Sequence, residues 1–468
     1  MRGITKCANR EIVKDFAKEI LQRRMRTAKP SKTVINFRTD IRDGIEREVF
    51  RVPIEILRFR KDNGRIASDV MDYERNISIL DEKDSQAQSQ IAEFLEQKDP
   101  EKTAALGMSI MHDGQRDPAI VTCDGFIING NRRKMVMDRL RREHPDNEHF
   151  SYMKVVILPG DEEGEGGPPT LLEIEKIENR YQLQSDGKSE YYGFDRALSI
   201  KRKIDLGLPL QEQLRDDPRY VKVTQTELEK AVKQYEKDFL LPLACVDRYL
   251  RQFRREGYYR TISAGMSDPE GRWQAFKDYS DRYSSCFNNK KRLLELGIEE
   301  EEIGGIEEAA FDIIRLRTIP DMPKVHQIMR DLPKYCRTKE GKKEILKIAD
   351  EVDPVLPREE LFDNNGNPLS IDQIDAKWTA TYKPKITWHV KKAATTHIMQ
   401  KEKETPIGLL DAALKKLTHD DMDLKAIGIS DFQTARKLIE DIKDRAIELE
   451  KQLYHHEKEL KKLLKDKK

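Results

Sequence analysis

The 468-residue sequence predicts an α+β protein with a small mixed-sheet domain in its N-terminal part, a largely α-helical region after it, and a long C-terminal helix or coiled coil. Three observations predict this class. Short β-branched runs separated by turn residues lie between residues 48 and 158, helical spacing of apolar residues dominates from 171 to about 350, and a heptad pattern occupies 435–463. The length suits two to four domains of roughly 100–200 residues each.

The elements of the N-terminal part follow from these patterns in order. Residues 9–27 have helical apolar spacing, and the alternation near 48–59 predicts a strand. Residues 84–108 predict a helix. Two β-branched runs follow, separated by a Cys-Asp-Gly hairpin turn, and another helix begins after Gly130. Residues 152–160 give the clearest prediction of a strand in the chain.

The composition argues against several classes of protein. The 86 basic and 85 acidic side chains leave a net charge of +1, so nothing in the overall balance demands a nucleic-acid partner. The five cysteines lie far apart without a Cys-x-x-Cys pair, which argues against a zinc site or a disulfide framework. No apolar run approaches the ~18–20 residues that span a bilayer. We also find no signal-type apolar core, and therefore expect a reduced, cytoplasmic protein.

Four features between residues 113 and 207 carry the candidate chemistry. The first is the stretch DGQRDPAIV at 113–121, where a glycine turn leads into a strand that tolerates proline only near its start. The second is DGFIINGNRR at 124–133, a hairpin turn, a β-branched run and the start of a helix. The third is the strand KVVIL at 154–158, and the fourth is the helical stretch at 173–207 that contains Glu-Asn-Arg.

The residues that follow Gly130 predict a phosphate-binding turn. Glycine lets the backbone turn sharply and approach a ligand closely. The first N–H groups of a helix have no intrahelical partner, and the helix dipole favours an anion beside them. Arg132 and Arg133 add permanently charged donors that suit phosphate oxygens. Because cations near a helix N-terminus are unfavourable without an anion, we favour this interpretation over a merely solvated helix start.

Together the four features resemble the N-terminal domain of the ParB/sulfiredoxin superfamily, over roughly residues 50–205. A ParB-type member has a Gln-x-x-Pro stretch, a turn, a glycine and two arginines opening a helix, a valine-rich strand and a Glu-Asn motif, in that order. The resemblance implies binding of a nucleoside triphosphate, CTP or ATP, together with Mg²⁺. It places Gly114 and Gln115 around the base, Gly130, Asn131, Arg132 and Arg133 at the phosphates, and Glu178 and Asn179 at the metal.

Residue chemistry bears on two parts of this resemblance. Glu178 and Asn179 offer the hard oxygen ligands that Mg²⁺ prefers, although residue types alone would leave them as ordinary helix side chains. ParB-type clamps usually have a glutamate where this chain has Asn131, which cannot act as a base. We therefore expect nucleotide binding with at most weak hydrolysis. Sulfiredoxin-type members have a nucleophilic cysteine at about that point, whereas Cys123 precedes the hairpin turn, so cysteine-sulfinate reduction is not expected.

Residues 222–256 predict a helix-turn-helix, the DNA-binding unit that follows the nucleotide domain in ParB-type proteins. Thr224 and Glu227 have the spacing of a capping box at the start of its first helix. The second helix carries arginines on its exposed face that suit phosphates and guanine edges, namely Arg248, Arg251, Arg254 and Arg255. The connection exceeds the usual 3–4 residues, so a helical bundle with a basic surface is the alternative.

The last part of the chain has an a/d heptad seam flanked by Lys and Glu. The seam suits either a homodimeric coiled coil through the helix at 435–463 or a helix packed on its own domain. The seam residues are Ala435, Ile439, Ile442, Ala446, Leu449, Leu453, His456, Leu460 and Leu463.

We therefore expect five segments. Residues 1–45 form a basic helical arm whose first 35 residues carry ten Lys or Arg against three acidic residues, which suits either a polyanion partner or a solvated helix face. The other segments are a nucleotide-binding domain at 46–205, a helix-turn-helix-like DNA-binding domain at 206–300, a helical domain of unassigned role at 301–400 and a helical or coiled-coil segment at 401–468.

Three functions fit these features. The first is a DNA-binding protein that couples a bound nucleotide to DNA binding and self-association. The chain is longer than a standard partition protein, so a regulator from a phage or mobile element is as good an interpretation as a partition protein. The second is a metal-dependent nuclease or NTPase on the same scaffold, with Asp113, Asp124 and Glu178 as metal carboxylates. The third is a non-catalytic assembly protein.

Overall fold

The structure is a computed structural model of the whole chain. It describes residues 10–465 except 28–30, 36, 39–45, 99, 161–165, 184–192, 221, 264–270, 364 and 420–421. Parts of the predicted basic arm at 1–45 thus lie outside the described residues. The chain forms two compact units, residues 1–397 and 398–468.

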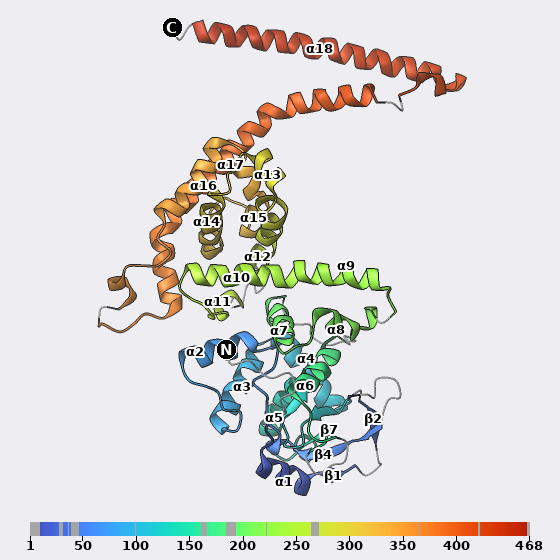
Figure 1. The fold of residues 1–468 in the computed structure, drawn as a ribbon, viewed down its shortest axis with the longest axis vertical. Helices are drawn as coiled ribbons and strands as arrows, with labels where there is room; N and C mark the ends of the chain where they lie inside the picture. Colours follow the sequence, from blue (N-terminus) through green and yellow to red (C-terminus); the bar gives the residue numbers. More distant parts are fainter. Residues whose placement is uncertain are drawn as a thin grey trace. The chain divides into compact units, whose positions relative to one another are not determined.

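A five-stranded mixed sheet organises the N-terminal part of the first unit (Figure 1), as the sequence predicts. The strand order is β1-β4-β7-β5-β6; β5 and β7 are parallel, and the other neighbours are antiparallel. The strands are β1 Met25–Arg26, β4 Phe50–Pro53, β5 Ala119–Val121, β6 Ile127–Asn129 and β7 Tyr152–Ile157, beside a separate pair, β2 Lys32–Val34 and β3 Glu46–Glu48.

Helices cover both faces of the sheet. Successive side chains along its central strands point alternately to the two faces, and those on both faces are apolar. Val155 of β7 belongs to the core that also contains Val136 of α5, whereas its neighbour Val156 packs in the core that contains Ile174 and Ile177 of α6. The helices of this part are α1 Lys14–Arg23, α2 Ala67–Asn76, α3 Ser85–Gln97, α4 Pro100–Asp113, α5 Asn131–Glu143 and α6 Leu171–Leu183, with 3₁₀ turns at Ile54–Ile56 and Glu148–Phe150.

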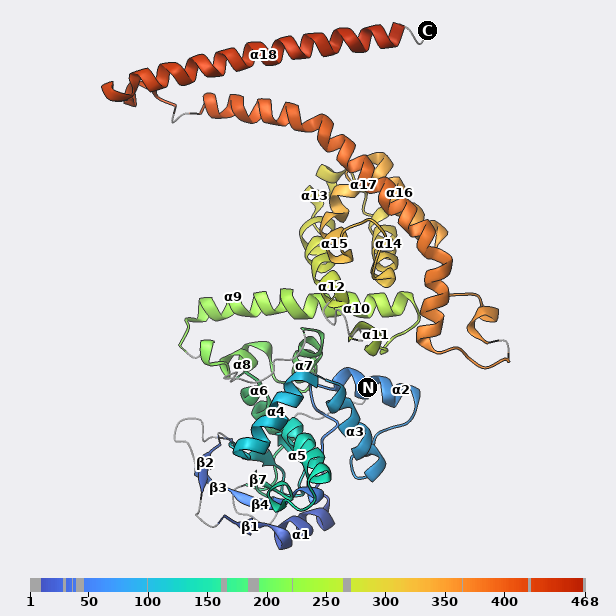
Figure 2. The same ribbon diagram turned by 180° about the vertical axis from the view of Figure 1, so that it is seen from behind.

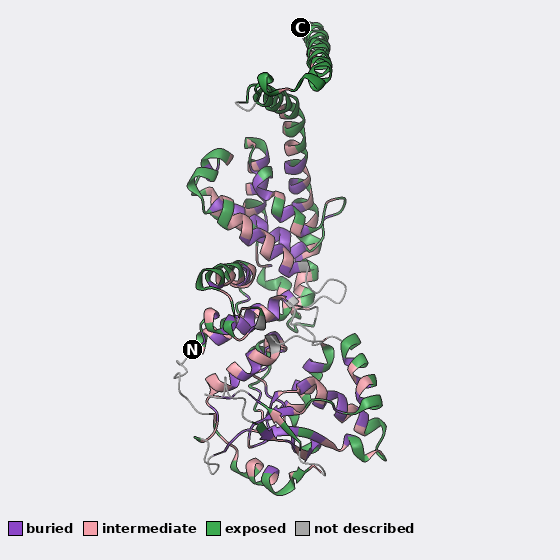
Figure 3. Ribbon diagram, turned by 90° about the vertical axis from the view of Figure 1, so that its right-hand side faces the viewer, coloured by how far each residue is buried: buried purple, intermediate pink, exposed green. Residues whose placement is uncertain are grey.

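The rest of the first unit is helical. Its main core includes Trp273, Phe311 and Trp378, so residues on both sides of the predicted boundary at 300 pack together. Figure 3 shows this buried interior. The helices are α7 Gly193–Asp205, α8 Leu210–Arg215, α9 Gln225–Tyr235, α10 Leu241–Gln252, α11 Arg260–Ser263, α12 Gly271–Arg282, α13 Lys290–Leu296, α14 Glu302–Leu316, α15 Val325–Tyr335, α16 Lys339–Glu351 and α17 Ile371–Leu417, which crosses into the second unit.

The helix-turn-helix predicted at 222–256 is wrong. The capping box at Thr224 and Glu227 is confirmed, but α9 and α10 are joined by the π-helical turn Glu236–Leu240 into one continuous rod (Figure 2). Pro242 lies in the first turn of α10. A π-turn shifts the backbone hydrogen-bonding pattern, and this accommodates a residue without an N–H group.

A buried acidic cluster joins α2 to α7 and α11. Asp72 accepts a hydrogen bond from the Arg260 backbone N–H at 2.7 Å. Ser68 donates to Asp195 at 2.9 Å, and Lys98 Nζ lies 3.3 Å from the same carboxylate. Burial raises the pKa of Asp72 to about 7 and that of Asp195 to about 6. The charged form of Asp72 therefore destabilises this junction.

Asp72→Asn is expected to stabilise the chain near neutral pH and above. The pKa of Asp72 is raised on folding, so folding takes up a proton, and its contribution to stability falls as pH rises from its ordinary pKa of 3.8 to about 7. Thermal unfolding at about pH 8 should give a higher Tm for the variant than for wild type, with a much smaller difference near the ordinary pKa of 3.8. Asp146→Asn, on an exposed residue, is the control. An equal Tm difference at both pH values would contradict the assignment.

Candidate functional site

The predicted strand–turn–helix around Gly130 is confirmed. Strand β6 ends at Asn129, α5 begins at Asn131, and Gly130 between them has φ 112°. A Cβ atom on Gly130 would lie 2.8 Å from the Cβ of Ala119 on β5, which is closer than real contacts allow. The turn therefore requires glycine for two independent reasons: its backbone conformation and the close approach of a neighbouring strand.

The first turn of α5 presents a buried amide and two partly buried arginines. Asn131 is 8 % exposed; its Nδ2 lies 3.5 Å from the Ile127 carbonyl, and its Oδ1 accepts no hydrogen bond within the part of the chain that the structure describes. Arg133 donates to the carbonyl of Asp117, and burial lowers the pKa of its guanidinium. An arginine with a lowered pKa is still charged at neutral pH.

Gln115 and Arg133 meet at one carbonyl oxygen. Nε2 of Gln115 donates to Asp117 O at 2.9 Å, the atom that also accepts from Arg133. The same Nε2 donates to Lys154 O at 2.7 Å, and Oε1 of Gln115 accepts from Lys154 N at 2.6 Å. The Gln115 side chain thus binds the backbone of β7 and fixes the loop that contacts Arg133. It is therefore not available for the predicted contact with a nucleotide base. Gly114, with φ 70°, ends α4 just before it.

Glu178 and Asn179 are buried and hold the protein's own groups. Glu178 accepts from the backbone N–H of Gly64 at 3.2 Å. Asn179 Nδ2 donates to Gln213 O at 3.0 Å, and its Oδ1 accepts from the Lys203 ammonium at 3.1 Å. An ammonium at that oxygen occupies the position that a metal ion would need, so the two predicted metal ligands do not fit Mg²⁺ in this arrangement.

A balanced set of buried and partly buried charges surrounds these two side chains. Arg60 lies 3.5 Å from Glu175 and 3.9 Å from Glu178, and Arg202 lies 3.0 Å from Glu175 and 3.3 Å from Asp62. Burial raises the pKa of Glu175 and lowers that of Lys203. Within the described ranges, no group of three or more His, Cys, Asp and Glu side chains could hold a metal ion. The network joins α6 to α7 as a structural ion-pair cluster.

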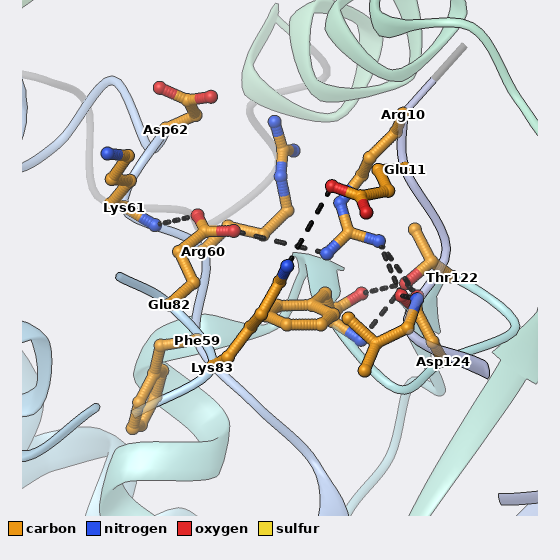
Figure 4. A network of polar contacts seen from close by, with 12 residues as sticks. Arg10, Glu11, Phe59, Arg60, Lys61, Asp62, Glu82, Lys83, Thr122 and Asp124 are labelled. Atoms are coloured by element: carbon orange, nitrogen blue, oxygen red, sulfur yellow. Dashed lines mark hydrogen bonds and ion pairs between the residues drawn. The ribbon is translucent and has the colours of Figure 1, made fainter. Parts of the chain in front are cut away.

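Asp124 is also structural. Its side chain is fully buried, and both carboxylate oxygens accept from Arg10 at 2.8 Å (Figure 4). Thr122 Oγ1 donates to it at 2.6 Å, and the Val13 N–H donates at 3.0 Å. Asp113 instead pairs with His112 and Arg116 at the surface. The predicted grouping of Asp113, Asp124 and Glu178 around a metal is therefore wrong, because the three carboxylates bind different partners in different places.

Two of the four predicted DNA-binding arginines form ion pairs inside the helical unit. Arg248 binds both carboxylate oxygens of Glu307 on α14, at 2.8 and 2.9 Å. Arg255 is 8 % exposed and lies 2.9 Å from Asp375 on α17. Arg251 and Arg254 are exposed. The sequence pattern located a basic helix face but gave no sign that α14 and α17 pack against part of it.

Sequence reasoning missed a three-helix unit one element earlier. Helices α7, α8 and α9 share a small core of Ile200, Leu210, Leu214 and Leu228, and residues 216–224 connect α8 to α9. At the start of α9, Gln225 Oε1 accepts hydrogen bonds from the α8 side chains Gln211 at 3.4 Å and Arg215 at 3.3 Å. The capping box was the available signal, but it marks α9, the third helix of this unit, instead of the first helix of a helix-turn-helix.

The face of α9 opposite its buried side carries the α9 stripe, which consists of Thr226, Lys230 and Lys233. At 100° per residue these positions lie about 140–200° away from Leu228 around the helix. All three side chains are exposed, whereas the next lysine along, Lys237, pairs with Asp281 at 2.6 Å.

Comparisons of the chain with protein-family models, with curated proteins and with solved structures each gave no match. Among the helices that the structure describes, none combines the length and the apolar character needed to cross a membrane.

Proposed function

We propose that the chain is a DNA-binding protein that holds a nucleoside triphosphate at the start of α5. The observation that carries the nucleotide part is the turn at Gly130 together with Asn131. The first helical N–H groups follow a turn that only glycine fits, and the buried Oδ1 beside them accepts no hydrogen bond from the described residues. A buried acceptor without a donor costs free energy, and a ribose hydroxyl or an ordered water supplies one.

Charge supports an anion at this turn. Lys134 is the first residue of α5 whose N–H bonds back along the helix, at 2.9 Å to Gly130 O. The backbone N–H groups of residues 131–133 therefore stand at the positive end of the helix dipole. Arg132 and Arg133 increase the positive charge there, and a triphosphate offsets it. The contact of Gln115 with Asp117 O keeps the loop under Arg133 in place.

Magnesium enters this proposal only with the nucleotide. When bound to a triphosphate it neutralises part of the phosphate charge. Glu178 and Asn179 already bind Gly64 and Lys203, so we assign them no metal. No hydrolytic step is proposed, because Asn131 cannot take a proton from water.

The DNA interface that we propose is α8 and α9. A short helix followed by a capped second helix around a shared core suits insertion of the second helix into a major groove. Gln211 and Arg215 lie beside the N-terminus of α9, where such units contact the DNA backbone. The α9 stripe then faces the groove. This assignment replaces Arg248 and Arg255, which pair with Glu307 and Asp375.

The double variant Lys230→Ala/Lys233→Ala is expected to weaken DNA binding and reduce its salt dependence. Each lysine that contacts a phosphate releases about one counterion, so the slope of log affinity against log salt should fall by about 2. Fluorescence anisotropy on a labelled duplex over a salt series measures both effects. The matched control is Lys291→Ala/Lys343→Ala, which removes the same charge from exposed sites elsewhere. Equal slopes for the two double variants would rule out the α9 interface.

Self-association through α18, Phe432–Lys465, completes the proposal. Its a/d seam lies on a helix that is exposed along most of its length (Figure 3). The same observation favours the second candidate function, a non-catalytic assembly protein. Calorimetric titration with nucleoside triphosphates separates the two, because only the first candidate binds one.

A further inference from the structure

The heptad seam of α18 is unpartnered in the described chain. Ile439, Ile442, Leu453, Leu460 and Leu463 are each between 45 and 67 % exposed. Four heptads of apolar residues in water are unfavourable, because each methylene left exposed forgoes the gain from burial. A helix with this seam stabilises itself by pairing with another helix that carries a matching seam.

The residue types in the seam distinguish the two ways in which identical helices can pair. In an antiparallel pair centred on Lys451, each seam residue on one side of Lys451 faces the seam residue of the second copy that lies equally far on the other side. The distances from Lys451 are 12, 9, 5 and 2 residues. Large then meets large, and the small Ala446 meets His456. In a parallel pair, each residue faces its own copy, so Ala446 meets Ala446 and leaves a gap, while two His456 rings meet at a buried layer. The antiparallel layers are Ile439 with Leu463, Ile442 with Leu460, Ala446 with His456, and Leu449 with Leu453.

The charges beside the seam favour the same orientation. Lys443 and Arg445 flank its N-terminal half, and Glu457 and Glu459 flank its C-terminal half. Antiparallel pairing places Lys443 against Glu457 of the second copy and Arg445 against Glu459 of the second copy. By symmetry each of these opposite-charge pairs occurs twice. One pair of like charges remains, between Glu450 and Glu450 of the second copy. In a parallel pair, only Arg445 meets an opposite charge, at Glu450 of the second copy.

The present partners of these flanking charges do not oppose this pairing. Arg445 pairs with Glu448 and Lys461 with Glu457, each within its own helix. These are exposed surface pairs, and such pairs contribute little to stability. They can be exchanged for contacts across the interface at small cost.

We propose that two copies of the chain associate through α18 as an antiparallel two-stranded coiled coil centred on Lys451. This inference rests on the proposed self-association. At 1.5 Å per residue, Ile439 of one copy lies roughly 36 Å along the coil from Ile439 of the other. The two chains therefore enter the coil at opposite ends.

Cysteine cross-linking on the full-length chain tests the orientation. Ile439→Cys and Leu463→Cys chains are mixed, oxidised mildly and digested, and disulfide-linked peptides are identified by mass, which separates them from links through native cysteines. We expect the 439–463 link between chains in the mixture and no link in either variant alone, because disulfides need Cα atoms within about 7 Å. A 439–439 link shows a parallel coil and overturns the proposal.

A charge exchange tests it without cysteines. Lys443→Glu and Glu457→Lys each place like charges across an antiparallel coil, so each should raise the dimer dissociation constant several-fold by analytical ultracentrifugation. The double variant Lys443→Glu/Glu457→Lys restores opposite charges and should return the constant close to wild type. Lys451→Glu, which makes the same charge change at a position facing away from the seam, is the control and should have little effect.

The outcomes separate the two levels of the proposal. A wild-type chain that is monomeric at every concentration overturns both the self-association and the coil. A dimer in which the double exchange fails to restore affinity overturns only the antiparallel orientation and leaves the proposed DNA and nucleotide sites untouched.

Discussion

Asp124→Ala is expected to lower the free energy of unfolding by about 3–5 kcal/mol, the range found when one partner of a buried ion pair is removed. Asp124 is fully buried and accepts from Arg10, Thr122 and Val13 at once. Its removal leaves the guanidinium of Arg10, itself largely buried, without its closest anion. Chemical denaturation followed by circular dichroism measures the loss.

Two further variants test whether the loss of stability comes from the buried ion pair between Arg10 and Asp124. Asp113→Ala removes a carboxylate that the nuclease hypothesis also used, but its partners His112 and Arg116 are solvated, so little effect on stability is expected. The double variant Arg10→Met/Asp124→Leu removes both charges and should recover part of the lost stability, because no uncompensated charge remains. An Asp124→Ala protein as stable as Asp113→Ala would show that the Arg10 contact is not formed.

Gly130→Ala is expected to cost roughly 2–4 kcal/mol of stability, from a left-handed backbone and a steric overlap together. The added Cβ would lie 2.8 Å from Ala119 Cβ, on a strand that cannot easily move. Gly114→Ala isolates the backbone effect, because Gly114 has φ 70° with open space around the new atom, and should cost only about 1 kcal/mol.

A second substitution separates the two contributions at Gly130. Ala119→Gly removes the atom that the new methyl group would strike, so Gly130→Ala/Ala119→Gly should be more stable than the sum of the single effects predicts. If Gly130→Ala costs no more than Gly114→Ala, the close approach of β5 to the turn is not present in solution.

Local patterns in the sequence predicted the sheet and the turn well. Alternating β-branched runs located β5, β6 and β7, and Gly130 before two arginines located the start of α5, because these signals depend on residues close together in the chain. The capping box at Thr224 was likewise a local signal and was confirmed. The heptad spacing correctly indicated a long helix at α18.

The sequence failed where distant segments decide the outcome. Nothing near Asn179 in the sequence indicates that Lys203 donates a hydrogen bond to its amide oxygen. Likewise, nothing near Arg248 indicates that its guanidinium pairs with the carboxylate of Glu307. The continuity of α9 and α10 depends on a π-turn that accommodates Pro242, which sequence rules treat as a break. These pairings can be seen only in the tertiary structure. Predictions from residue type alone therefore assigned metal and DNA contacts to side chains that bind other groups of the protein.

The measurement that tests the central claim most directly is isothermal titration calorimetry of the full-length chain with CTP, ATP, GTP and UTP, each with Mg²⁺, in the presence and absence of duplex DNA. We expect one triphosphate to bind with one site per chain. Arg132→Ala should weaken that binding at least tenfold, the loss of one charge-assisted contact, and Lys230→Ala/Lys233→Ala should leave binding without DNA unchanged. If none of the four nucleotides binds under either condition, the turn at Gly130 is a structural element and the proposed nucleotide-binding function is wrong.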